Sequence, residues 1–386
     1  MTAASRATPS QSRDATGAST WVVILAGGVG SRFWPASIPR RPKQLLPLGR
    51  TGQPLVRETV QRALDLVPPE RLRILTGRAL RDPILQALPD LPESCVWTEP
   101  QARGTGPALL WAAHRIQAQD PGATMVSLHS DHVVEPAAGF TATLQTALRL
   151  ARDTGLLFTV AAPPDRPETG YGYIRPGAPL ASANGGGHEG PRAFRVEQFQ
   201  EKPDRETAGR YIEEGCLWNT GIFVWRTDGF LREARAAAPE LGDSLDLLAG
   251  DGSSGGAEAF FDGVPSISVD HAVLERSRKV GAVQAEFRWD DVGSWEALAR
   301  MGNPDEADNF AVGQAHVADG TGNLVYSGDG RPIVLYGVDG LVVVRTPEAT
   351  LVTTRERAAH LKGLVDDLPG PLKDPPAPPE ERESAP

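Results

Sequence analysis

The sequence predicts an α/β fold in which a doubly wound, mostly parallel sheet is followed by a small all-β domain. Residues 21–26 are a continuous apolar run stopped by glycines, as expected of a buried parallel strand. Strand and helix patterns then alternate. From residue 309 the helical periodicity is replaced by short β-branched runs between turn residues. The 386 residues are enough for one large domain and a smaller one.

The remaining elements of the large domain follow from their hydrophobic patterns. In residues 55–64 the apolar positions fall on one helical face. Residues 107–116 form a helix pattern with Pro107 in the first turn. Proline is tolerated there because the N–H groups of the first turn make no hydrogen bond within the helix. Because strands alternate with helices of this length, we expect βαβ units. The other predicted elements are strands at 73–76, 124–128 and 156–161 and a helix at 140–151.

The C-terminal part is expected to be short strands followed by a helix at 358–366. Strands of this length are compatible with the coils of a β-solenoid. Both chain ends are poor in large apolar side chains, so we expect them to be disordered. The predicted strands lie at 323–326, 333–338, 341–345 and 350–353. The predicted divisions are a tail at 1–19, a large domain at 20–305, a small β domain at 306–368 and a proline-rich tail at 369–386.

Charge and composition exclude several classes of protein. The net charge of −10 argues against a surface built for nucleic acid or anionic membrane. The chain has no apolar run of 18 residues and no signal-peptide pattern at its start, so we expect a cytoplasmic protein. Cys95 and Cys216 lie far apart and outside any CxxC pattern, which argues against a disulfide framework or a zinc site.

A glycine-rich turn follows the first strand at residues 25–32 and predicts phosphate binding. Glycines allow backbone N–H groups to approach phosphate oxygens. The turn lacks the third glycine of the dinucleotide fingerprint and the Gly-Lys-Ser/Thr of a P-loop. Arg32 and Lys43, with Arg40 and Arg41 between them, add positive charge beside it; the alternative is a solvated charged face. The candidate nucleotide-binding residues of the turn are Leu25, Ala26, Gly27, Gly28, Gly30 and Ser31.

Several motifs then make the resemblance specific. LAGGVGSRFWP at 25–35 and PKQLLPL at 42–48 resemble the signature of sugar-nucleotide pyrophosphorylases, and most of all the mannose-1-phosphate guanylyltransferases. The later motifs agree in order and spacing, so the resemblance covers roughly residues 20–365. They are Arg103–Pro107, Ser130–His132, Thr169–Ile174, Glu201–Pro203, Trp218–Gly221, Asp270–Ser277 and Trp289–Trp295.

This resemblance implies that residues 20–305 are a nucleotidyltransferase domain. A sugar 1-phosphate oxygen would attack the α-phosphorus of a nucleoside triphosphate and release pyrophosphate, with GTP and mannose 1-phosphate as the expected substrates. The alternatives are another sugar or base, or a catalytically idle regulatory homologue that binds a nucleotide sugar. A dehydrogenase is a distant third, since the cofactor fingerprint is incomplete. We expect a homo-oligomer, with a dimer favoured.

The resemblance also assigns roles to single residues. Phosphoryl transfer needs positioning and charge neutralisation more than covalent help. Arg32 and Lys43 would stabilise the leaving pyrophosphate, and Lys202 would hold the sugar phosphate. Asp131, which follows a predicted strand, and Asp291 would hold Mg²⁺. The remaining implied contacts are Arg103, Thr105 and Asp131 for the nucleotide and Gly172, Glu201, Lys202 and Asn219 for the sugar.

Two details of the sequence modify this assignment. His129 and His132 form an H-x-x-H pair, to which we assign structural roles rather than metal binding. Family members carry Arg-Asn-Thr-Ala-Pro where this chain has Arg103-Gly-Thr-Gly-Pro107. The loss of the asparagine weakens the inference to guanine and leaves backbone groups of Gly104 and Gly106 as candidates for contacting the base.

Overall fold

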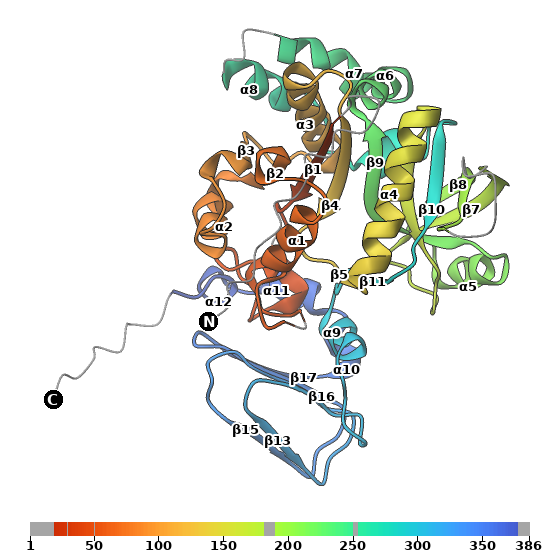
Figure 1. Ribbon diagram of the computed structural model, residues 1–386. Helices are drawn as coiled ribbons and strands as arrows, with labels where there is room; N and C mark the ends of the chain where they lie inside the picture. The colour runs from red at the N-terminus through yellow and green to blue at the C-terminus, as the bar shows by residue number, and fades with distance from the viewer. Residues whose placement is uncertain (1–18, 29, 50, 181–189, 250–253, 377–386) are drawn as a thin grey trace, which may run out of the picture.

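The computed structural model describes residues 19–28, 30–49, 51–180, 190–249 and 254–376, and it contains a large α/β domain and a small β domain (Figure 1). The large domain is built on a nine-stranded sheet with the strand order β3-β2-β1-β4-β9-β6-β10-β8-β7. Its strands are β1 (Thr20–Leu25), β2 (Leu72–Gly77), β3 (Val96–Glu99), β4 (Thr124–His129), β6 (Leu157–Ala162), β7 (Gly172–Pro179), β8 (Ala193–Glu201), β9 (Leu217–Arg226) and β10 (Val280–Gln284).

The α/β class is confirmed, and the sheet is mostly parallel: seven of its nine strands run in one direction, and β8 and β9 run in the other. Strands β3, β2, β1 and β4 run parallel, as predicted. Strand β9 is antiparallel to both β4 and β6, and β8 is antiparallel to β7 and β10. A reversed strand arises where consecutive strands such as β7 and β8 pair directly with each other, without the crossover that parallel pairing requires.

Helices cover both faces of the sheet and bury two apolar cores. One core contains residues of α1, α2 and α4, and the other contains residues of α3, α6 and α8. The predicted helices at 55–64, 107–116 and 140–151 correspond to α1, α3 and α4. The helices of this domain are α1 (Leu55–Leu64), α2 (Arg81–Ala87), α3 (Thr105–Gln119), α4 (Ala137–Thr154), α5 (Arg205–Glu213), α6 (Thr227–Ala237), α7 (Pro239–Gly242), α8 (Ser254–Gly263) and α9 (Trp295–Met301).

A separate two-stranded ladder joins two distant parts of the large domain. Strand β5 (Val133–Glu135) pairs antiparallel with β11 (Arg288–Asp290), and Val133 lies opposite Asp290. Asp131 precedes the first strand by two residues, and Asp291 directly follows the second. The ladder therefore brings the loops that carry these two carboxylates together.

The small domain is built from short coils, as a β-solenoid is. Strands β12, β14 and β16 form one parallel set, which β17 extends antiparallel, and β13 pairs parallel with β15. The predicted C-terminal helix is divided into α10 and α11. The elements are β12 (Phe310–Val312), β13 (Ala315–Ala318), β14 (Leu324–Ser327), β15 (Ile333–Tyr336), β16 (Leu341–Arg345), β17 (Thr350–Thr354), α10 (Arg355–Ala358), α11 (Leu361–Asp367) and α12 (Gly370–Lys373).

The predicted disordered tail at 369–386 is wrong for residues 369–376. These residues include α12 and return to the large domain, where Leu372 and Asp374 contact the segment that follows the glycine turn. Their partners, Trp34 and Arg40, lie more than 300 positions earlier in the sequence, so local composition carries no sign of the contact. Residues 1–18 and 377–386 lie outside the described part of the chain. Among the described helices, none has the length and apolar character needed to cross a membrane.

Candidate active site

The glycine turn after β1 is open on one side and tightly packed on the other. A Cβ added to Gly27 or Gly28 would meet no atom within 4 Å, so the backbone there is accessible to a ligand. Gly30 has a φ of 75°, and a Cβ added to it would lie 2.5 Å from the Cβ of Lys43. Glycine is required at position 30 because the side chain of Lys43 crosses the turn there.

Lys43 links the turn to both candidate metal ligands. Its side chain is buried, and its Nζ donates to Oδ2 of Asp131 at 2.9 Å and to the main-chain oxygen of Asp291. Burial opposes ionisation of Asp131, but the positive charge of Lys43 and its hydrogen bond outweigh this effect and hold the pKa of Asp131 well below its usual value. Asp131 is therefore an ionised carboxylate at neutral pH.

The two adjacent aspartates after β11 have different environments. Oδ1 of Asp291 accepts hydrogen bonds from the Tyr171 hydroxyl at 2.7 Å and from the Gly293 amide at 2.8 Å. Asp290 is buried and pairs with Arg166 at 3.1 Å. The structure thus brings Asp131 and Asp291 together around Lys43 and assigns Asp290 to an internal ion pair.

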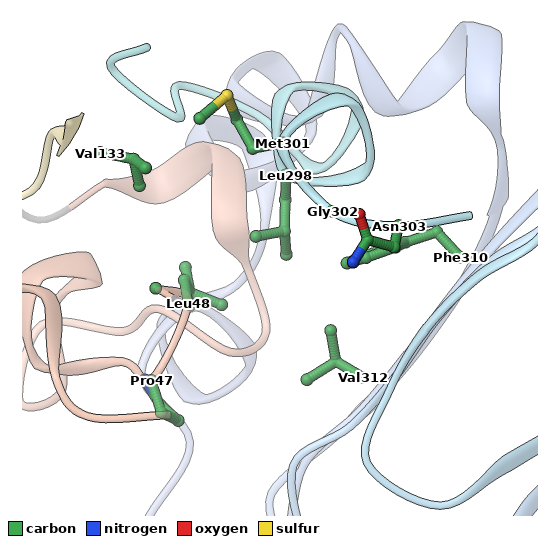
Figure 2. A pocket seen from close by; sticks show the side chains of 10 residues that line it. Pro47, Leu48, Val133, Leu298, Met301, Gly302, Asn303, Phe310 and Val312 are labelled. Atoms are coloured by element: carbon green, nitrogen blue, oxygen red, sulfur yellow. The ribbon is translucent and has the colours of Figure 1, made fainter. Parts of the chain in front are cut away.

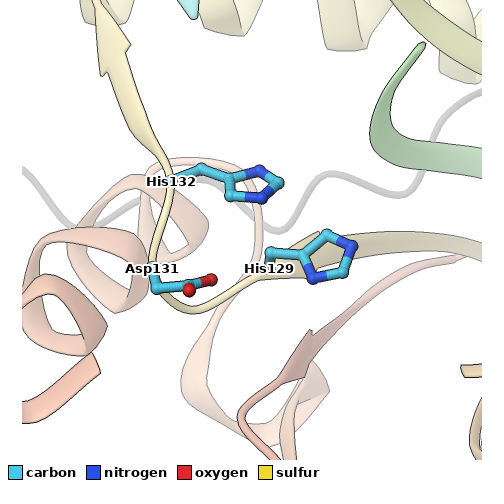
Figure 3. Close-up of side chains that lie close together, drawn as sticks. All are labelled: His129, Asp131 and His132. Carbon is cyan, nitrogen blue, oxygen red and sulfur yellow. The ribbon is translucent and has the colours of Figure 1, made fainter. Parts of the chain in front are cut away.

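His129, Asp131 and His132 form a compact group whose potential ligand atoms lie within 4.8 Å of one another (Figure 3). Burial lowers the pKa of both histidines, so they are neutral near pH 7. Nδ1 of His132 lies 3.1 Å from the indole Nε1 of Trp289, which can only donate. The proton of neutral His132 is therefore on Nε2, which then has no lone pair for a metal. This geometry supports a structural role for His132.

The predicted sugar-binding residues lie together at the ends of β7, β8 and β9. In the sheet register, Gly172 lies opposite both Glu201 and Asn219. A Cβ added to Gly172 would lie 2.6 Å from Oε2 of Glu201, so this carboxylate packs directly over the glycine. Lys202 pairs with Oε1 of Glu201 at 2.7 Å, and its side chain is largely exposed. The ammonium of Lys202 is accessible to an anionic ligand.

Asp270 is a site residue that the sequence did not single out. Its Oδ1 accepts from Nδ2 of Asn219 at 2.8 Å, while Oδ1 of Asn219 accepts from the Thr159 hydroxyl at 2.7 Å. These two bonds fix the orientation of the Asn219 amide. Burial and the nearby charge of Glu201 raise the pKa of Asp270 to about 6. The signal was the motif that begins at Asp270, but sequence alone does not show that its carboxylate is buried beside Asn219.

The loop at 103–107 packs against a later segment. The amide of Gly106 donates to the Ile267 oxygen at 3.1 Å, and the Thr105 hydroxyl accepts from the Val269 amide at 3.0 Å. Gly104 has a φ of 78°, and a Cβ there would lie 2.7 Å from the Ile267 oxygen. The Gly106 amide is therefore not available to a base. Arg103 donates through Nε to the Phe261 oxygen at 3.0 Å.

The four basic residues near the glycine turn have different interaction partners. Arg32 is exposed and has no hydrogen bond or ion pair with any residue that the structure describes. Its guanidinium lies beside Gly293, where an added Cβ would be 3.1 Å from Nη1. Arg40 and Arg41 instead pair with Glu348 of the small domain. The expectation that these two arginines add charge to the phosphate turn is wrong, because Glu348 pairs with both of them and Asp374 pairs with Arg40 as well.

Glu99 at the end of β3 is a second residue that sequence reasoning missed. It makes no hydrogen bond or ion pair within the described residues, and burial raises its pKa to about 7. It lies opposite Gly77 in the register, and a Cβ added to Gly77 would meet nothing within 4 Å. Glu99 is two strands from the glycine turn, on the same edge of the sheet, roughly 10 Å away by strand spacing. An unpartnered carboxylate therefore borders open space at that edge.

Replacing Glu99 by glutamine should change how stability depends on pH. The folded state holds the Glu99 proton more tightly than the unfolded chain, so Glu99 reduces stability as pH rises from about 4.5 to about 7. We expect E99Q to gain up to about 3 kcal/mol over the wild type between pH 4.5 and pH 8. Urea unfolding at several pH values measures this difference. If the free energies of unfolding of the two proteins changed in the same way with pH, the raised pKa of Glu99 would be contradicted.

A cavity of about 310 Å³ lies at the seam between the two domains (Figure 2). It is lined mainly by apolar side chains, including Leu48, Val133, Leu298 and Phe310. Because none of the described residues that line it has an ionisable side chain, these residues are not suited to bind a phosphate. The charged groups of the candidate site lie instead at the carboxyl ends of β1 and β4.

The fold and these charged groups define a nucleotidyl transferase. Residues 21–308 match the family described as nucleotidyl transferase, and the chain belongs to that family. Residues 314–368 match the family described as the MannoseP isomerase/GMP-like beta-helix domain, in agreement with the predicted solenoid.

Similar proteins make the class more specific. The chain is 33% identical to the mannose-1-phosphate guanylyltransferase of Escherichia coli over 90% of this chain and 73% of that protein. It is also 33% identical to the alginate biosynthesis protein AlgA of Pseudomonas aeruginosa, over 90% of this chain and 71% of that protein. A crystal structure from Thermus thermophilus, titled as a mannose-1-phosphate geranyltransferase, is 32% identical, covers 90% of this chain and 98% of its own, and superposes with a TM-score of 0.79. The resemblance to this group is confirmed.

Proposed function

We propose that the protein transfers GMP from GTP to mannose 1-phosphate, forming GDP-mannose and releasing pyrophosphate. The observation that carries this proposal is the position of Lys43, whose ammonium lies between Asp131 and Asp291 beside an open glycine turn. This arrangement offers positive charge, carboxylates and free backbone N–H groups to a triphosphate. The named relatives support the choice of substrates.

The triphosphate would lie on Gly27 and Gly28, with Arg32 and Lys43 neutralising the charge that develops on pyrophosphate as it leaves. Lys202 would hold the sugar phosphate so that its oxygen approaches the α-phosphorus in line. Glu201 and Asn219 would accept and donate hydrogen bonds to the sugar hydroxyls. No side chain is required as a nucleophile.

Asp131 and Asp291 also fit a divalent cation. The ammonium of Lys43 already takes oxygen ligands from both residues, which indicates a place where positive charge is stabilised by oxygen. Mg²⁺ prefers such hard ligands and usually keeps one or two protein carboxylates. When bound, it would neutralise phosphate charge during transfer.

Glu99 supports the choice of guanine. Among the four bases, guanine alone presents two neighbouring donors, its ring N–H and its amino group, to a carboxylate. A uracil or thymine would place a carbonyl oxygen against the same acceptor.

The proposal also includes a homodimer in the cytoplasm that acts on small molecules only.

Pyrophosphate release should therefore be fastest with GTP and mannose 1-phosphate when Mg²⁺ is present. The measurement is a grid of four nucleoside triphosphates against mannose, glucose, galactose and N-acetylglucosamine 1-phosphates. E99Q in the same grid should lose its preference for GTP, because an amide presents one donor and one acceptor. A maximum in another cell would change the substrates but keep the reaction, and silence throughout would favour a regulatory homologue.

A further inference from the structure

The loop that joins the two catalytic cations is held by the small domain. We call residues 31–43 the signature loop; it runs from the glycine turn through Arg32 to Lys43. Glu348, in the turn between β16 and β17, points at it with a side chain that is only 4% exposed. Oε1 of Glu348 accepts from Arg40 Nη2 and Arg41 Nη1, both at 3.1 Å, and Oε2 accepts from Arg41 Nη2 at 3.0 Å. One buried carboxylate therefore fixes two neighbouring arginines.

The turn that carries Glu348 is held by hydrogen bonds between its own residues. The amide of Thr346 donates to the Ala349 oxygen at 2.9 Å, and the amide of Glu348 donates to the Thr346 hydroxyl at 3.3 Å. Thr346 is buried. Because the turn closes on itself, the position of the carboxylate is set by the backbone of the small domain.

Contacts inside the signature loop connect Arg41 to Lys43. Ile38 and Arg41 exchange backbone hydrogen bonds of 3.1 and 2.9 Å, and Nε of Arg41 donates to the Ala36 oxygen at 3.2 Å. Pro42 directly precedes the short helix in which Lys43 is the first residue. A displacement of Arg41 would therefore be passed to the backbone of Lys43.

The C-terminal segment adds a second attachment. The indole of Trp34 donates to the Leu372 oxygen at 3.2 Å, and Arg40 pairs with Asp374 at 2.8 Å. Phe33 packs against Trp295 at a tilted angle with ring centroids 4.9 Å apart, and the centroid of Trp295 lies 5.2 Å from that of Tyr326 of β14. The signature loop is thus embedded in the core of the small domain.

We propose that Glu348 is a positioning residue for nucleotidyl transfer. It acts through Arg41 to keep Lys43 between Asp131 and Asp291 and to keep Arg32 at the glycine turn. This inference rests on the proposed function, and it makes the small domain a working part of the active site. Loss of the carboxylate would leave Arg41 without its ion-pair partner beside Arg40, which would keep only Asp374, and the repulsion between the two guanidinium groups would open the loop.

The test compares E348Q with D329N in the full chain. Asp329 is a matched control because it is a buried carboxylate of the same domain, pairs with Arg345 at 3.1 Å, and makes no contact with the signature loop. We expect E348Q to lower kcat/KM at least about 10-fold with its Tm close to that of D329N, while D329N keeps wild-type kcat/KM. E348D, which retains the charge on a shorter side chain, should recover part of the loss.

A second readout does not depend on turnover. Trypsin can cleave after Arg40, whereas the Arg41–Pro42 bond resists it, so the rate of cleavage at Arg40 reports how firmly the loop is held. We expect faster cleavage in E348Q and a wild-type rate in D329N. Unchanged kcat/KM in E348Q, or equal cleavage rates in E348Q and D329N, would overturn the inference. An inactive wild type would instead contradict the proposed reaction. The cleavage rates do not depend on that reaction, so they still test whether Glu348 holds the loop.

Discussion

Replacing Asp131 by asparagine is expected to reduce kcat on the order of 1,000-fold while the fold is retained. The change keeps the size of the side chain but removes the charge that faces Lys43 at 2.9 Å. It also removes one of the two carboxylates proposed to hold the divalent cation. Steady-state pyrophosphate release at saturating substrates measures the loss.

The metal role of Asp131 can be measured without turnover. Mn²⁺ binding followed by electron paramagnetic resonance should weaken in D131N, and far-UV circular dichroism should confirm that the variant is folded. H271A is a suitable control, because His271 is exposed and pairs only with Glu275 among the described residues. A D131N protein that keeps more than about a tenth of wild-type kcat would rule out the assigned role.

Replacing Gly30 by alanine is expected to lower kcat roughly 10- to 100-fold and to destabilise the protein by about 1–3 kcal/mol. The residue has a φ of 75°, and its new Cβ would lie 2.5 Å from the Cβ of Lys43. The lysine must move, so its ammonium leaves its position between the Asp131 carboxylate and the main-chain oxygen of Asp291. Activity and thermal unfolding of the purified variant measure the two effects.

Gly52 offers the matched control for this substitution. It also has a positive φ, of 68°, but a Cβ there would meet nothing within 4 Å. G52A should therefore show the backbone strain alone, with a similar loss of stability and normal kcat. If G30A and G52A had the same kcat, the contact between Gly30 and Lys43 would not affect catalysis.

The parts of the site that depend on local pattern could be predicted from the sequence. The glycine turn, Lys43, Asp131 and the Glu201-Lys202 pair lie in short motifs at strand ends, and the structure places them at the edge of the sheet. Glu99 and Asp270 could not be found this way. Their importance comes from burial and from missing or distant partners, which are properties of the folded chain.

Long-range partners explain the other differences. The local sequence predicts that Arg40 and Arg41 bind phosphate, because their partner Glu348 follows about 300 residues later and is not visible in the local pattern. The ordered segment at 369–376 was missed for the same reason. The mixed character of the sheet arises in residues 172–226, where strands pair with neighbours that a one-dimensional pattern of apolar residues does not identify.

The ladder between β5 and β11 has a consequence for the divalent cation that we propose for this site. Asp131 and Asp291 come from segments 160 positions apart, yet the backbone pairing of Val133 with Asp290 sets their separation. The entropy of bringing the two carboxylates together is therefore lost when the chain folds, and not when an ion binds. Preorganisation of this kind lets a weakly held, readily exchanged cation find its ligands already in place.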